Sequence, residues 1–113
     1  MTAGHALIIG NTDGIGLVLT RRLLALGWTV TGVSRRSPVV EAPGFHGAVA
    51  DVAAADYRAT LEALCAARGP FDACVYCAGI GDALDLDALA GDAEVVRVNL
   101  VGAVETIAAV VPG

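Results

Sequence analysis

Three glycines that follow a short apolar run near the start of the chain constrain the fold more than any other feature of the sequence. Gly10, Gly14 and Gly16 come directly after the apolar run Ala6–Ile9, and a helical pattern begins at Ile15. A glycine turn between a strand and a helix places backbone N–H groups beside the positive end of the helix dipole. The pattern therefore predicts a pyrophosphate-binding turn, in which Gly10 makes the tight bend, Gly14 admits the phosphates and Gly16 allows close packing.

Glycines also collect in ordinary turns, so their spacing has to be compared with the known phosphate-binding patterns. The common dinucleotide pattern G-x-G-x-x-G fails, because Leu19 stands where the third glycine would follow Gly14 and Gly16. A regular three-residue spacing from Gly10 fails at Asp13. The phosphate loop of nucleotide hydrolases needs a lysine, and the chain contains none. The pattern that remains is G-x-x-x-G-x-G.

The rest of the chain alternates strand-like and helix-like segments with short connections, which predicts one α/β domain over residues 1–113, built on a parallel sheet with right-handed crossovers. In the first helix an apolar stripe is expected to face the core, formed by Ile15, Val18, Leu19, Leu23 and Leu26. The expected strands are Ala6–Ile9, Thr29–Ser34, Ala48–Asp51 and Ala73–Cys77; the expected helices are Ile15–Leu26, Ala53–Arg68 and about Gly91–Val110, with a loop at Ser37–Gly47.

Composition excludes several classes of function. The net charge is −5, with seven arginines and twelve acidic residues, which argues against nucleic acid as a partner. Every apolar run is far shorter than the roughly 18 residues of a membrane span, and the start of the chain lacks a secretory signal, so we expect a cytoplasmic protein without membrane contact. An apolar content of 56% is high for a free-standing small domain and predicts burial against a partner or the remainder of a longer chain.

The three cysteines form no recognisable metal or disulfide framework. Cys74 and Cys77 make a CxxC pair, but a strand sends these two positions to opposite faces of the sheet. No second pair and no histidine cluster completes a zinc site, so we expect core packing and no metal. An odd count of cysteines fits a reducing compartment.

The pattern G-x-x-x-G-x-G, placed between the first strand and the first helix, resembles the short-chain dehydrogenase/reductase family. The resemblance implies a Rossmann-like, doubly wound parallel sheet with four strands in the order 3-2-1-4, and a chain truncated to about the first half of a family member. It also implies a nicotinamide dinucleotide as cofactor. The residues that would form the phosphate turn are Gly10, Asn11, Thr12, Asp13, Gly14, Ile15 and Gly16.

Further positions extend the resemblance along the chain. Arg35 follows the second strand where the family places a residue facing the adenosine ribose, and with Arg36 it favours NADP over NAD, although a solvated surface pair is the alternative. Asp51 and Val52 resemble the pair that contacts adenine, while Asp51 could equally cap the next helix. The segment Cys77, Ala78 and Gly79 resembles the contact to the nicotinamide-side ribose, and Asn99 resembles the residue that holds a water for the proton relay, unless it makes a structural hydrogen bond.

The family's Ser, Tyr and Lys, which carry out hydride transfer, lie beyond the point where this chain stops. We therefore expect the chain to represent the cofactor half of an oxidoreductase acting on a carbonyl or an alcohol, and to bind cofactor without turnover. Two other hypotheses stay open: a non-catalytic nucleotide-binding module, and a half-domain that completes itself as a homo-oligomer through the open edge of its fourth strand.

Overall fold

The computed structural model describes residues 4–12, 14–77 and 101–111. The sheet has four parallel strands in the order β3-β2-β1-β4, which confirms the predicted order and the doubly wound fold. The strands are β1 (His5–Ile9), β2 (Thr29–Ser34), β3 (Phe45–Val49) and β4 (Ala73–Tyr76); the helices are α1 (Gly14–Ala25), α2 (Tyr57–Arg68) and α4 (Gly102–Val110).

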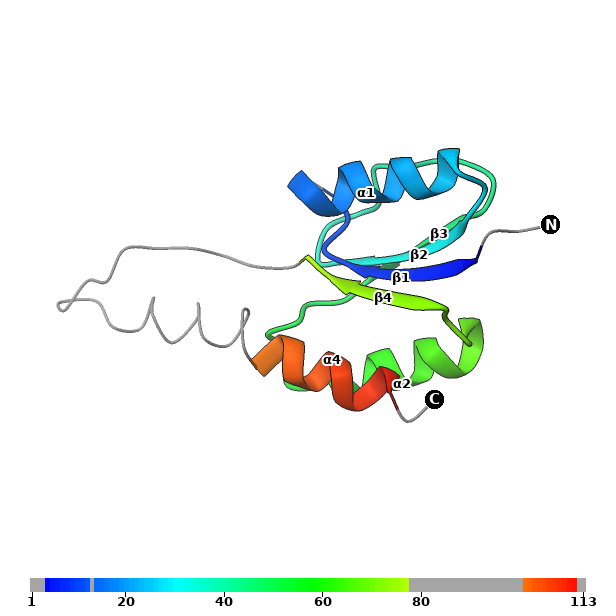
Figure 1. Cartoon of the computed structure of the whole chain (residues 1–113). Coiled ribbons are helices and arrows are strands. Elements are labelled where there is room, and N and C mark those ends of the chain that lie inside the picture. Colours follow the sequence, from blue (N-terminus) through cyan, green and yellow to red (C-terminus); the bar gives the residue numbers. More distant parts are fainter. Residues whose placement is uncertain (1–3, 13, 78–100, 112–113) are drawn as a thin grey trace, which may run out of the picture.

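Helices cover both faces of the sheet (Figure 1): α1 lies on one face, and α2 and α4 lie side by side on the other. The central strand β1 is apolar on both faces, as a parallel strand between two helical layers must be, and Leu7 and Ile9 are fully buried. These two side chains form the main core with Tyr57 and Leu61 of α2 and with Ala109 of α4. The core therefore lies between β1 and the α2–α4 layer.

The expected bounds were wrong by one residue for β1 and α1, which cover His5–Ile9 and Gly14–Ala25, and the bounds of three further elements also differ. Strand β3 covers Phe45–Val49 instead of Ala48–Asp51, because Gly44 takes a positive φ of 86° and the sheet pairing begins at the next residue. Helix α2 begins at Tyr57 instead of Ala53, since residues 52–56 form turns. Strand β4 ends at Tyr76, one residue earlier than expected. The first part of the last expected helix, residues 91–100, lies outside the described residues.

Helix α1 packs on the sheet with a face that the sequence did not indicate. Its buried residues are Gly16 and Thr20, whereas Ile15 is 80% exposed and Val18 and Leu26 are also exposed. Residues four apart lie on the same side of a helix, and these two are small, so the helix backbone approaches the sheet closely. Of the expected stripe, Ile15, Val18 and Leu26 are thus turned toward solvent, whereas Leu19 and Leu23 are half-buried.

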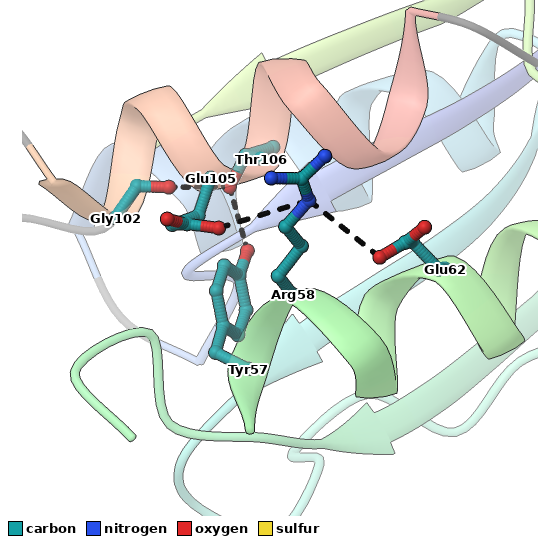
Figure 2. A network of polar contacts seen from close by, with 6 residues as sticks. All are labelled: Tyr57, Arg58, Glu62, Gly102, Glu105 and Thr106. Carbon is teal, nitrogen blue, oxygen red and sulfur yellow. Dashed lines mark hydrogen bonds and ion pairs between the residues drawn. The ribbon is translucent and has the colours of Figure 1, made fainter. Parts of the chain in front are cut away.

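A buried hydrogen bond and an exposed ion pair join α2 to α4, as Figure 2 shows. The Tyr57 hydroxyl and Thr106 Oγ1 are 2.7 Å apart, and Thr106 Oγ1 also donates to the Gly102 carbonyl at 2.8 Å. Because a threonine hydroxyl carries one proton, Tyr57 is the donor in the first bond. Near the surface, Arg58 Nε lies 3.6 Å from Glu62 and 3.9 Å from Glu105.

Candidate functional site

The glycine turn leaves β1 at Gly10 and enters α1 at Gly14. Both glycines have positive φ, 87° and 53°, which a residue with a side chain adopts only with strain. The Gly10 N–H donates to the Val33 carbonyl at 2.6 Å, so the turn is anchored to the end of β2. Glycine is required at Gly10 and Gly14 because their backbone dihedral angles lie in the left-handed region.

The two helical glycines of the turn differ in their surroundings. A Cβ on Gly16 would collide with the Gly10 carbonyl oxygen, so the absence of a side chain lets α1 start against the turn. A Cβ on Gly14 would meet no described atom within 4 Å, and Gly14 is exposed. The N-terminus of α1 is therefore open on the side of Gly14, where the helix dipole is positive. Open space over backbone N–H groups is what a diphosphate requires.

The hydroxyl of Ser34, at the end of β2, connects the glycine turn with the arginine pair. Thr12 Oγ1 lies 3.0 Å from Ser34 Oγ, and the backbone N–H of Arg36 donates to the same oxygen at 3.2 Å. Arg35 and Arg36 are exposed beside it. Sequence reasoning missed Ser34 because the expected strand order makes β1 and β2 neighbours but does not give the register that brings Ser34 to Thr12.

Asn11 lies beneath the turn instead of facing outward. Its side chain is buried and packs on Gly32 of β2, where a Cβ would collide with the Asn11 amide nitrogen. Among the described residues, Asn11 Nδ2 has no hydrogen-bond partner. A buried donor without a partner lowers the free energy of unfolding by about 1–3 kcal/mol, so the placement of Asn11 destabilises the fold.

Asp51 forms a local turn after β3. Its carboxylate accepts a hydrogen bond from the Ala53 N–H at 2.9 Å, and its carbonyl accepts one from the Ala54 N–H at 3.0 Å. The alternative in which Asp51 caps the next helix is wrong, since α2 starts at Tyr57 and its N-cap residue is Asp56, which makes no side-chain cap. Only one carboxylate oxygen of Asp51 is engaged in this turn.

The structure brings most of the predicted site residues to one edge of the sheet, because the carboxyl ends of parallel strands share an edge. Cys77, directly after β4, is half-buried and donates its N–H to the Ile9 carbonyl at 2.7 Å. Val52 is half-buried against the core. The residues at this edge are Gly10, Asn11, Thr12, Gly14, Ile15, Gly16, Arg35, Arg36, Asp51, Val52 and Cys77. Asp13, Ala78, Gly79 and Asn99 lie outside the described residues.

The cysteines divide between two environments. Core packing was wrong for Cys74, which is exposed because β4 is an outer strand of the described sheet and has a neighbour on one side only. Burial raises the pKa of the Cys77 thiol above its ordinary value, which disfavours the thiolate. In the described part of the chain, no group of three or more His, Cys, Asp or Glu side chains is placed to hold a metal ion. Nor does that part contain a helix long and apolar enough to span a membrane.

Comparisons with known proteins agree with this geometry. A family model described as short chain dehydrogenase matches residues 4–113. A putative betaketoacyl-ACP reductase superposes with a TM-score of 0.83 at 28% identity, over 99% of this chain and 49% of its own. The ligand-free aldohexose dehydrogenase of Thermoplasma acidophilum gives 0.84 at 22%, over 98% and 44%. A short chain dehydrogenase of Leptospira borgpetersenii with bound NAD+ gives 0.79 at 23%, over 93% and 43%.

The chain thus spans about half the length of these solved structures. None of the curated proteins matches it significantly.

Proposed function

Since the chain belongs to the short-chain dehydrogenase family, we propose that it is the cofactor-binding half of an oxidoreductase that acts on a carbonyl or an alcohol. The observation that carries the proposal is the open glycine turn between β1 and α1. When bound, a nicotinamide dinucleotide supplies or accepts the hydride of such a reaction. The chain's own residues bind and orient the cofactor.

The residues of the turn fit a diphosphate. The space over Gly14 admits phosphate oxygens, and Gly16 keeps the helix close to the turn because its missing side chain avoids the Gly10 carbonyl. The positive end of α1 favours the negative charge of the phosphates. Thr12, held by Ser34, closes one side of the turn. Backbone N–H groups therefore provide the main contacts to the phosphates.

We propose NADP as the preferred cofactor. Arg35 and Arg36 are exposed directly after β2, and the Ser34 hydroxyl holds the backbone N–H of Arg36 at 3.2 Å. A guanidinium at this place matches the 2′-phosphate of NADP, because its N–H groups form paired bonds with phosphate oxygens. The similar Leptospira protein contains NAD+, so the two cofactors have to be compared directly in an experiment.

The remaining contacts follow the edge of the sheet. The carboxylate oxygen of Asp51 outside the local turn is the acceptor for the adenine amino group, with Val52 beside the ring. Cys77, with Ala78 and Gly79, contacts the nicotinamide-side ribose through the backbone. Asn99 holds a water of the proton relay. The assignments of Ala78, Gly79 and Asn99 rest on the family resemblance, because these residues lie outside the described part of the chain.

The direct test is a titration of the chain with NADPH, followed by the cofactor's fluorescence, in parallel with NADH. We expect saturable binding with NADPH the tighter ligand. The substitution Arg35→Asp should weaken NADPH binding about 10–100-fold, the factor for one charge-assisted hydrogen bond, and leave NADH nearly unchanged. Arg21→Asp, on the exposed side of α1, is the matched control for charge. No binding at millimolar cofactor would contradict the proposal, and equal losses for both cofactors would assign Arg35 a structural role.

A second part of the proposal concerns the surface of α4. The exposed apolar residues of α4 and of its two flanking positions are Val101, Val104, Ile107 and Val111, and the neighbouring strand β4 is an outer strand of the described sheet. We propose that the remainder of a longer chain covers this surface, because the similar structures are about twice as long. Light scattering on the purified chain tests whether this apolar surface is covered by further chain. Oligomers that dissociate when the following residues of the reading frame are added support the proposal. A stable monomer contradicts it.

A further inference from the structure

A cavity of about 460 Å³ opens at the amino ends of the strands, the opposite end of the sheet from the glycine turn. It lies on the face of the sheet that α2 covers. The side chains that matter for its chemistry are His5 of β1, Thr29 and Thr31 of β2, His46 of β3, and Arg68, the last residue of α2. No carboxylate of the described residues lines it.

The pairing register explains why these polar groups meet. Thr29 stands beside His5 and Thr31 beside His46, so all four side chains lie on one face of the sheet. Leu7 and Val33, further along the same face, belong to the apolar core. Since α2 ends at Arg68, the helix leaves the polar end of the face open.

The contact between Arg68 and His46 defines the protonation of the ring. Arg68 Nη2 lies 2.7 Å from His46 Nδ1. A guanidinium has no acceptor, so Nδ1 accepts, the ring is neutral in this arrangement, and its proton is on Nε2. His46 is half-buried, and its Nε2–H is a second donor beside the charged guanidinium.

His5 of β1 lines the cavity together with the donors Arg68 and His46. Its Nε2 lies 2.9 Å from Thr31 Oγ1, and its ring makes an edge contact with Phe71 at 4.7 Å between centroids. The nearby carboxylate of Asp72 accepts the backbone N–H of His5 at 2.7 Å and does not line the cavity. The lining thus carries one full positive charge together with N–H and O–H donors.

From these contacts we infer that the cavity is a binding site for a small anion, a phosphate or a carboxylate, whose oxygens are held by Arg68 and His46. Arginine binds phosphate and carboxylate oxygens in pairs, and an adjacent neutral imidazole N–H adds a third donor. The site is independent of the cofactor proposal, because none of its residues belongs to the carboxyl edge of the sheet.

The test uses amide N–H correlation spectra of the chain during titration with inorganic phosphate, acetate and phenyl phosphate, at constant ionic strength with chloride as the balancing ion. We expect saturable shifts at Thr31, His46 and Arg68 with phosphate and with phenyl phosphate, because both present the same phosphate oxygens. The phosphate and acetate arms distinguish the two head groups. Shifts confined to residues 10–16, or equal shifts with phenol, would overturn the inference.

Variants separate the site from general charge effects. Arg68→Gln should weaken phenyl phosphate binding about tenfold, the factor for one charge-assisted hydrogen bond, and His46→Gln should weaken it less. Arg22→Gln, in the last turn of α1 on the other face of the sheet, should change nothing. If the Arg68→Gln variant does not give the dispersed spectrum of a folded chain, Arg68→Lys is tested in its place. Lysine keeps the positive charge but cannot form the paired N–H bonds of a guanidinium. Unchanged affinity in a folded Arg68 variant would refute the site.

Discussion

The hydrogen bond between Tyr57 and Thr106 is expected to stabilise the packing of α2 on α4 far more than the ion pair beside it. Tyr57→Phe removes the donor and leaves Thr106 bonded to the Gly102 carbonyl. Thr106→Val removes the acceptor and leaves the buried Tyr57 hydroxyl without a partner. Arg58→Gln, one position along α2, removes both exposed ion pairs and is the matched control (Figure 2).

The structure sets the order of the effects. Tyr57 is 1% exposed and Thr106 is 3% exposed, so water cannot replace the lost bond. We expect Tyr57→Phe to lower the free energy of unfolding by about 0.5–1.5 kcal/mol and Thr106→Val by about 1–3 kcal/mol, because a buried unpaired donor costs more than a lost acceptor contact. The side chains of Arg58 and Glu62 are more than half exposed, 53% and 55%, so Arg58→Gln should cost about 0.2–1 kcal/mol at most.

Urea unfolding of the three variants and of the double variant Tyr57→Phe/Thr106→Val measures these values. The double variant should lose less than the sum of the single losses, because it leaves no unpaired hydroxyl donor. Strictly additive losses would mean that the two side chains are not coupled. A loss for Arg58→Gln as large as that for Thr106→Val would refute the reasoning from burial.

Three further outcomes follow from the geometry. Gly16→Ala should lower stability by about 1–3 kcal/mol in urea unfolding and weaken NADPH binding, because its Cβ collides with the Gly10 carbonyl and the backbone has to move. Burial raises the pKa of Tyr76 from 10.0 to about 12, so its contribution to stability is complete below about pH 10 and is lost as the pH rises toward 12; unfolding at about pH 9 and about pH 11 measures the decline, and a flat profile would contradict it. Because burial raises the pKa of Cys77, alkylation of this thiol, followed by mass spectrometry, should be slower at neutral pH than that of a free cysteine.

The sequence predicted the parts of the fold that depend on local pattern. The short apolar run at Ala6–Ile9 and the glycines at positions 10, 14 and 16 were enough to predict the buried central strand and the turn, whereas the sheet order came from the family resemblance. The start of β3 was wrong because Pro43 and Gly44 have loop character, while the pairing with β2 extends to the residue next to Gly44. The buried side of α1 was wrong because two small residues, Gly16 and Thr20, allow a closer approach to the sheet than larger apolar ones.

The missed polar contacts have a different cause. Ser34 meets Thr12, and His46 meets Arg68, across 22 positions of the chain in both cases. Such pairs can be predicted only from the strand order and the register together. No residue spacing in the sequence gives that register. The candidate anion site could therefore not be predicted, whereas the glycine turn, which is contained in seven consecutive residues, could.

The glycine turn at one end of the sheet binds through backbone groups, whereas the anion site at the other end binds through side chains. This difference should decide which substitutions each site tolerates. At the carboxyl end, the turn uses backbone N–H groups and requires glycine at positions 10, 14 and 16, so exposed neighbours such as Ile15 are free to vary. At the amino end, the donors are the side chains of His46 and Arg68, and each is replaceable by a single change that leaves the strands paired. Relatives that keep the glycine turn can therefore lose the anion site without losing the fold, which makes that site the more specific property of this chain.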